Sequence, residues 1–393
     1  MKHILIITVS LTSLTFTLTQ CSKNQGNPVG AQFFQRESWG SENCIFQQAA
    51  SDTFYYTSVN TGSSSSLYLG QYQGSESRIL VLFSNLPDSG TVDSALVTLY
   101  TQRTIGSATH PATASVHAIN RAWEESEITW ESFGEGSIGE QIATMEISDE
   151  QPAADNDTTA IIFYLPPSRI QSWMDSSQAS ENFGILLASF PPDTGYFIEF
   201  FSRESTSDEF KGPRMTIYIT QDTTHETYNV YPTQDTFIAN TRREPTSDRL
   251  FIANGIALRS MLSFNVDSIP DNATINRALL TLYSDTLLSF PDHRESFDVI
   301  VYPVTDGSWP IPAVPFDSTM GIAGSVIEDS TVMNLTPFVQ GWTAGFTTNY
   351  GLLLIGWNER NDLHRRAFYS IATDSHRQPK LKIFYTLPPS SRL

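Results

Sequence analysis

The chain has 393 residues, which at about 100 to 200 residues per domain predicts two domains. Lys and Arg number 23 against 42 Asp and Glu, and the net charge of -19 repels phosphate backbones and anionic membrane surfaces, which excludes nucleic acid as a partner. Aromatic residues make up 12% of the chain and charged residues only 17%, which is typical of a turn-rich β protein, and the 2 cysteines are too few for a disulfide framework.

The first 21 residues have the pattern of an export signal. Lys2 and His3 precede an apolar, hydroxyl-rich segment over residues 4–18, which is shorter than a transmembrane helix requires. Leu18-Thr19-Gln20-Cys21 follows and resembles the lipobox of bacterial lipoproteins, which implies that Cys21 becomes the first mature residue and carries lipid. Gln stands where a small residue is usual, so ordinary secretory cleavage stays open as the alternative. Ser rather than Asp follows the cysteine, which favours the outer membrane or cell surface.

A polar tether is predicted between this signal and the first folded domain. Residues 22–44 are polar and show little periodicity, which suits a flexible segment. Cys44, at its end, is expected to pack as a small apolar side chain in the first strand. No later segment approaches 18 consecutive apolar residues, so the rest of the chain is predicted to be soluble.

An internal repeat divides the remaining chain into two copies of one domain. Asp52-Thr53-Phe54 recurs as Asp235-Thr236-Phe237, and residues 91–100 (TVDSALVTLY) recur at the same offset as residues 274–283 (TINRALLTLY). Further matched blocks follow in the same order. The repeat predicts two domains, at 45–220 and 228–387, joined by a short polar link.

Most segments of each copy are predicted to be strands. Residues 95–100 alternate apolar with polar side chains, whereas residues 184–188 and 351–355 are apolar throughout, as in a strand at the centre of a sandwich. Residues 166–174 and 337–343 predict one short helix per copy. About eight strands per copy without helical crossovers predict an all-β chain of two tandem antiparallel jelly-roll-like β-sandwich domains.

The ordered blocks resemble the DNRLRE domain, a secreted β-sandwich module related to carbohydrate-binding modules. In the first copy the resemblance is carried by residues 123–130 (WEESEITW) and 201–204 (FSRE). The second copy reduces the first of these to 306–309 (DGSW) and replaces the second with 369–371 (YSI), and the hexapeptide that names the family is absent from both. The resemblance implies a sandwich fold and an accessory role, and it leaves the partner unspecified.

Motifs for catalysis are missing from the sequence. There is no HExxH, no GxSxG and no Walker loop, and no pair of acids recurs between the copies. We therefore expect a protein that is not an enzyme, and a glycan-cleaving activity is the least favoured of the functions considered.

The best candidate for a ligand site lies in the second copy. Trp357 and Arg360, followed by His364, Arg365 and Arg366, fall between two predicted strands and are expected to share one hairpin loop. Cations gathered there in an acidic chain favour an anionic polysaccharide, since guanidinium groups bind carboxylates in two bonds and the indole can stack on a sugar ring. The alternative is a solvated hairpin without a ligand.

Two aspartates recur at the same place in both copies. Asp52 and Asp235 each precede an aromatic strand residue, and both could bind a structural calcium ion. An aspartate that accepts a backbone hydrogen bond at the start of a strand explains the recurrence equally well. Trp123 and Trp130 flank a Glu-rich turn, where they either stack on sugars or anchor the core.

These patterns favour a non-catalytic surface lipoprotein that binds polysaccharide or scaffolds a cell-surface assembly. The membrane is expected to be contacted only through the N-terminal lipid. The alternative is a structural or adhesive module that contacts other proteins.

Overall fold

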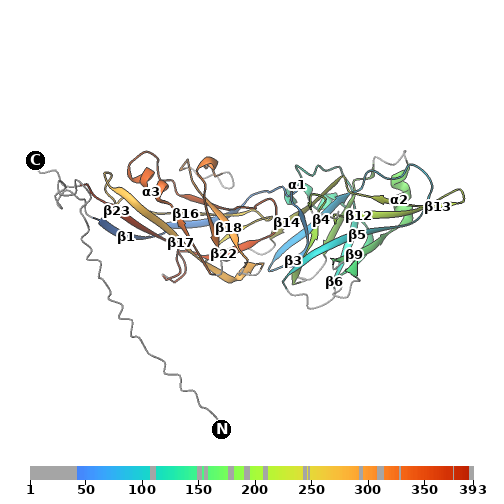
Figure 1. Cartoon of the computed structure of the whole chain (residues 1–393), viewed down its shortest axis with the longest axis horizontal. Helices are drawn as coiled ribbons and strands as arrows, with labels where there is room; N and C mark the ends of the chain where they lie inside the picture. Colours follow the sequence, from blue (N-terminus) through green and yellow to red (C-terminus); the bar gives the residue numbers. More distant parts are fainter. Residues whose placement is uncertain are drawn as a thin grey trace, which may run out of the picture. The chain divides into compact units, whose positions relative to one another are not determined.

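The computed structural model describes most of the chain between residues 42 and 388 (Figure 1). The described residues are 42–106, 112–147, 153–154, 158–175, 181–189, 195–206, 211–241, 246, 248–291, 295–307, 314–326, 329–374 and 376–388. The predicted signal and Cys21 lie outside them, as does most of the predicted tether. The tether prediction is wrong at its end, because residues 42–44 already belong to a strand.

One antiparallel sheet contains twelve strands. They are β3 (Ser66–Tyr72), β4 (Ser75–Leu82), β5 (Thr91–Gly106), β6 (Ala112–Ile119), β7 (Ile138–Ile147), β8 (Ala153–Ala154), β9 (Thr158–Leu165), β10 (Ile185–Ser189), β11 (Tyr196–Phe201), β12 (Arg214–Gln221), β13 (Thr224–Val230) and β14 (Gln234–Thr241). The hydrogen-bonded order is β13-β12-β5-β11-β3-β4-β10-β6-β7, with β14 on β4, β9 on β5 and β8 on β9.

The other antiparallel sheet contains eleven strands. They are β1 (Glu42–Gln48), β2 (Ser51–Tyr56), β15 (Arg249–Ala253), β16 (Leu258–Ser263), β17 (Thr274–Phe290), β18 (Phe297–Pro303), β19 (Ile322–Val326), β20 (Ser330–Asn334), β21 (Leu352–Gly356), β22 (Arg365–Tyr369) and β23 (Lys380–Thr386). Their order is β1-β23-β17-β22-β15-β16-β21-β18-β19, with β2 on β16 and β20 on β17. The chain is therefore all-β, with two antiparallel jelly-roll-like sandwiches in tandem, as the sequence predicts.

Burial follows the sequence patterns that predicted the strands. Ala95, Val97 and Leu99 of β5 are fully buried at alternate positions. The two continuous apolar runs form β10, which pairs with β4 and β6, and β21, which pairs with β16 and β18. Alternate side chains of each strand enter different core clusters on its two faces, as Ile185 and Leu186 do in β10. A strand with a core on both faces is expected to be apolar along its length.

Helices are short and few in the part of the chain that the structure describes. They are α1 (Trp130–Phe133), α2 (Pro167–Met174) and α3 (Thr336–Thr343), with 3-10 turns η3 (Glu135–Ser137) and η5 (Ser318–Met320). Both α2 and α3 carry proline in the first turn and bury a tryptophan, Trp173 and Trp342, which confirms the two predicted helices. No described helix has the length and apolarity needed to cross a bilayer.

The sheets do not follow the boundaries of the sequence repeat. β14, which opens the second copy, pairs with β4 of the first copy over Gln234 to Thr241. β2, which belongs to the first copy, pairs with β16 of the second, and β1 pairs with the last strand, β23. The domains expected at 45–220 and 228–387 would put β1 and β2 in the same sheet as β3, and β14 in the same sheet as β15. The structure has the reverse arrangement. The contiguous stretch β3–β14 forms one sheet, and the N-terminal strands β1 and β2 complete the other.

A hairpin explains this exchange. The polar link predicted between the domains is the turn between β12 and β13, in which Gln221 pairs with Thr224 and Asp222 has a φ of 52°. Asp tolerates this left-handed conformation better than most residues. β13 therefore folds back along β12 and carries β14 onto β4 instead of starting a separate domain.

The hydrophobic cores also cross the repeat boundary. One large core joins β3–β14 with residues of the second copy such as Phe251 and Phe290, and a second large core contains described residues of β1, the following turn and the second copy. Phe237 of β14 is fully buried, with its ring centroid 5.0 Å from that of Tyr68. Residues 42–387 accordingly cluster as one unit. Cys44 is exposed on β1, so the prediction that it packs inside is wrong.

Candidate functional site

The strongest ligand candidate from the sequence lies on the loop that joins β21 to β22. This loop is not the predicted hairpin, because β21 pairs with β16 and β18 whereas β22 pairs with β15 and β17. The loop therefore crosses two intervening strands, and its ends are set by different parts of the sheet.

Several bonds fix the loop to the sandwich. Glu359 accepts two hydrogen bonds from the guanidinium of Arg259, of 2.8 and 2.7 Å, and both side chains are largely buried. The amide of Gly255 donates to the carbonyl of Glu359 at 2.8 Å, and the amide of Trp357 donates to the carbonyl of Asp298 at 2.8 Å. A two-bond guanidinium–carboxylate pair restricts orientation as well as distance, so the loop is held in one geometry.

Trp357 and Arg360 point out of this fixed loop. The Trp357 side chain is 59% exposed, and Arg360 is exposed and has no ion-pair partner among the described residues. Exposing a tryptophan on a braced loop leaves a large apolar face in water, which is unusual for a residue that otherwise dominates cores and interfaces.

The three residues that complete the predicted cationic cluster are buried. Arg366 is fully buried and donates to the carbonyls of Pro291 and Glu295, at 3.2 and 2.5 Å. Arg365 is 6% exposed and donates to the carbonyl of Leu288 at 3.1 Å. Both arginines begin β22 inside the sheet, where they bind backbone carbonyls at and after the end of β17. The structure contradicts the expectation that they form an exposed ligand patch.

His364 is equally enclosed. It is 8% exposed, and burial, with the nearby Arg366 and Arg103, lowers the pKa of His364 to about 3. Its Nδ1 lies 3.7 Å from the carboxylate of Asp362, whose pKa burial raises to about 6. His364 is therefore neutral at pH 7 and adds no charge, which leaves Trp357 and Arg360 as the exposed members of the predicted set.

The recurring aspartates have one role in common. Asp235 Oδ2 accepts a hydrogen bond from the amide of Arg203 at 2.9 Å, and Asp52 Oδ2 accepts one from the amide of Ile371 at 2.7 Å. Positions 203 and 371 correspond in the repeat. Each aspartate thus fastens its exchanged strand to the other copy, and the backbone-acceptor explanation is confirmed for both.

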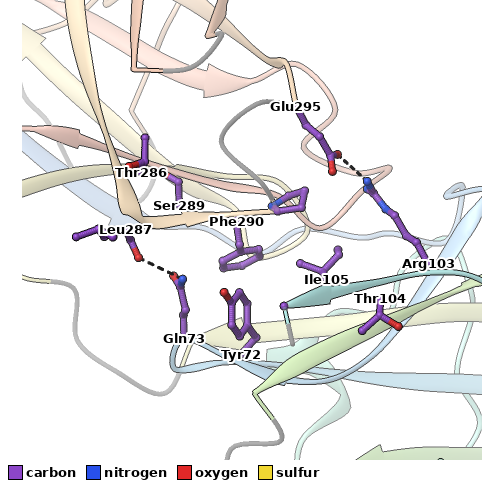
Figure 2. A pocket seen from close by; sticks show the side chains of 12 residues that line it. Tyr72, Gln73, Arg103, Thr104, Ile105, Thr286, Leu287, Ser289, Phe290 and Glu295 are labelled. Carbon is purple, nitrogen blue, oxygen red and sulfur yellow. Dashed lines mark hydrogen bonds and ion pairs between the residues drawn. The ribbon is translucent and has the colours of Figure 1, made fainter. Parts of the chain in front are cut away.

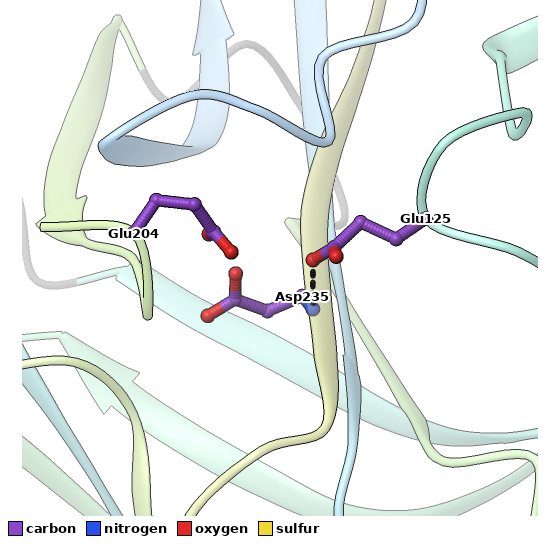
Figure 3. A group of neighbouring side chains, drawn as sticks. All are labelled: Glu125, Glu204 and Asp235. Atoms are coloured by element: carbon purple, nitrogen blue, oxygen red, sulfur yellow. Dashed lines mark hydrogen bonds between the residues drawn. The ribbon is translucent and has the colours of Figure 1, made fainter.

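Asp235 differs from Asp52 in its surroundings. Oxygen atoms of Glu125, Glu204 and Asp235 lie within 4.8 Å of one another, and Figure 3 shows the carboxylates of Glu204 and Asp235 facing each other. Burial and the adjacent Glu204 charge raise the pKa of Asp235 well above its ordinary value, and burial raises that of Glu125. Asp52 belongs to no such group among the described residues. We refer to Glu125, Glu204 and Asp235 as the carboxylate cluster.

A cavity of about 530 Å³ lies elsewhere, between β3, β5 and the end of β17 (Figure 2). The rings of Tyr72 and Phe290 meet edge-on in it, with centroids 5.8 Å apart. At its mouth Arg103 binds Glu199 at 2.5 Å and Glu295 at 2.6 Å, so these charges are already paired. The sequence does not predict this cavity, because its walls come from distant segments that share no motif.

The two tryptophans that flank the Glu-rich turn, Trp123 and Trp130, are not equally exposed. Trp123 is 6% exposed, packs in a core, and donates its indole N–H to the carbonyl of Phe183 at 2.9 Å. Trp130 is half-buried, with the guanidinium of Arg78 4.5 Å from its ring. The core explanation is therefore the one that the structure supports for Trp123.

Comparison with known proteins identifies no family. No protein-family model and no curated protein matches the chain. A solved structure of manganese lipoxygenase of Gaeumannomyces graminis, reported with a partial structure of zonadhesin of Komagataella pastoris, has a TM-score of 0.12 at 10% identity. That match covers 80% of this chain and 84% of the other, and a TM-score of this size carries no argument about fold or function.

Proposed function

We propose that the chain is a non-catalytic, lipid-anchored surface protein that binds an anionic polysaccharide through Trp357 and Arg360. The observation that carries the proposal is the 59% exposure of the Trp357 indole on a loop held by the Arg259–Glu359 pair. A rigid exposed aromatic ring offers a flat apolar face for a pyranose, and little conformational entropy is lost when a sugar binds to it.

Arg360 gives the site its charge preference. An exposed guanidinium in a chain of net charge -19 is a local attraction for carboxylate or sulfate groups, and it can bind a carboxylate in two bonds. A polymer presents the same groups many times, so a modest single contact can still retain the protein on a surface. We therefore favour a uronate-containing or sulfated polysaccharide.

Affinity electrophoresis in gels that contain such a polymer tests the proposal. Trp357→Ala should abolish most of the retardation of the native chain, and Arg360→Gln should weaken retardation in uronate gels more than in neutral glucan gels. Added salt should reproduce the effect of Arg360→Gln, because exposed charges are screened. Phe346→Ala is the matched control, since Phe346 is 83% exposed on the turn after α3. Equal retardation of the Trp357→Ala variant and the native chain would contradict the proposal.

A scaffolding role is favoured by the strand exchange. β2 and β14 pair across the repeat boundary along six and eight residue pairs, so the two copies cannot separate without breaking these ladders. Repeat copies that are joined in this way resist separation, which suits a surface assembly. A glycan array distinguishes the two functions, because a module that contacts only proteins should bind no glycan on it.

A further inference from the structure

We propose that the carboxylate cluster binds a divalent cation of the calcium type. Glu125 lies in the turn before α1, Glu204 follows β11, and Asp235 lies at the start of β14, so three segments distant in the sequence meet at one point (Figure 3). The proposal is independent of polysaccharide binding, since Trp357 lies on the loop between β21 and β22 and belongs to no part of the cluster.

Unpartnered oxygens point into the cluster. Asp235 is 1% exposed, and its Oδ1 lacks a hydrogen-bond donor among the described residues, as does the buried Oε2 of Glu204. Buried carboxylate oxygens without donors are costly, and they are uncommon unless a proton or an ion lies between them. Asp235 needs only Oδ2 to fasten its strand. Its remaining oxygen faces the carboxyl of Glu204, and the two groups can hydrogen-bond to each other only when one of them holds a proton.

The junction between β2 and the second copy supplies an internal comparison. Asp52 makes the same backbone bond, to Ile371, but the next residue is Ala372 where the first copy has Glu204. Fastening the exchanged strand therefore requires the aspartate alone. Glu204 adds a negative charge beside a buried carboxylate, which lowers stability unless another group compensates for it.

Arg203 compensates only in part. Its Nε binds Glu204 at 2.6 Å, and its Nη2 lies 3.5 Å from Glu125. Three carboxylates against one guanidinium leave two excess negative charges when all are ionised, which a divalent cation neutralises.

The dimensions fit one ion. Oxygen ligands lie 2.3–2.6 Å from calcium, so oxygens on opposite sides of the ion are about 5 Å apart. The cluster's ligand atoms lie within 4.8 Å of one another, which places all three within reach of a single cation. Oxygen-only ligands on flexible side chains favour calcium over zinc or copper.

Thermal unfolding of the full chain tests the site. After treatment with a chelator, calcium chloride at about one hundred times the dissociation constant should raise the melting temperature by roughly 4 °C for a unit of this size. Isothermal titration should give about one calcium ion per chain. Glu204→Gln should lower calcium affinity at least about tenfold, because it removes one charged ligand.

Asp52→Asn is the matched control, since it alters the equivalent backbone bond to Ile371, at a junction that lacks the cluster. Its calcium response should equal that of the native chain. Glu125→Gln provides a second variant, because its amide oxygen can still accept from the Asp235 amide, and it should weaken calcium binding as Glu204→Gln does. No calcium response in the native chain, or an equal response in the Glu204→Gln and Glu125→Gln variants, overturns the proposal.

Discussion

The exchange of β2 and β14 between the repeat copies predicts where the chain can be cut. A fragment over 45–220 follows the sequence repeat but lacks β14, whereas a fragment over 58–241 retains β3–β14 and the Thr61–Thr236 hydrogen bond. The two fragments are of similar length and share most of their residues. We expect only the fragment over 58–241 to melt cooperatively.

The expected difference follows from what β14 buries. Phe237 is fully buried and Ile238 is 3% exposed, and eight residue pairs join β14 to β4. Removing the Phe237 side chain alone costs about 3–5 kcal/mol, and removing Ile238 adds about 2–5 kcal/mol. That loss is comparable with the whole stability of a domain, about 5–15 kcal/mol.

A point substitution tests the same reasoning in the full chain. Phe237→Ala should destabilise by about 3–5 kcal/mol and accelerate hydrogen exchange at the amides of β4, although Phe237 belongs to the second copy in sequence. Phe54→Ala, at the equivalent position in β2, should cost less, because Phe54 is only partly buried, and should act on β16. Circular dichroism melts and exchange measured by mass spectrometry provide both readouts. Two results would refute the strand exchange. One is cooperative melting of the 45–220 fragment, and the other is hydrogen exchange that rises at β16 and not at β4 in the Phe237→Ala variant.

Two further predictions concern anchoring and pH. Cys21→Ser should move the protein from the membrane fraction to the medium, and unchanged partitioning would count against lipidation. The pKa of His364 is lowered to about 3 in the folded chain, so the unfolded chain takes up this proton more readily. Protonation of His364 in the unfolded state therefore lowers the free energy of unfolding as pH falls from about 6.5 to 3. His364→Gln should therefore lose less stability than the native chain over that range, by up to about 4 kcal/mol in urea melts, and parallel profiles would contradict this. Asp362 has the opposite effect, because its pKa is raised to about 6 in the folded chain. The folded state holds its proton more tightly than the unfolded state, so the stability that this proton contributes is lost as pH rises through 6.

The fold class could be predicted from the sequence because its signals are local. Alternation in β5 and the apolar runs of β10 and β21 report whether a segment has one or two buried faces. The proline and the apolar spacing of α2 and α3 are equally local. The pairing of strands depends on segments that are distant in the sequence, and the periodicity of one segment does not indicate which strand it pairs with. The partner of β14 depends on the hairpin at Asp222, a turn that in the sequence reads equally well as a polar link.

The candidate site was half predictable for a related reason. Trp357 and Arg360 could be predicted from residue type and from their place after a buried strand. Arg365 and Arg366 carry the same charge signal, but they begin β22. The carbonyls that bind them come from the end of β17 and the residues after it, some 70 residues earlier in the chain. A one-dimensional pattern shows that cations are close in sequence, whereas solvent exposure depends on the sheet around them.

The two copies have kept one framework and diverged in their polar groups. The blocks WEESEITW, FSRE and DTF are far apart in the sequence, yet they supply Glu125, Glu204 and Asp235, respectively, to one point of the fold. The second copy has lost the first two blocks, and its Ile371 amide binds Asp52, which holds the exchanged strand β2 without further acids. That copy instead carries the exposed Trp357. In the proposed roles, cation binding stabilises the sheet that contains β14, and the polysaccharide binds to a loop of the sheet that β1 and β2 complete. A chelator should then lower the melting temperature while leaving the retardation by polysaccharide unchanged, because the two sites share no residue.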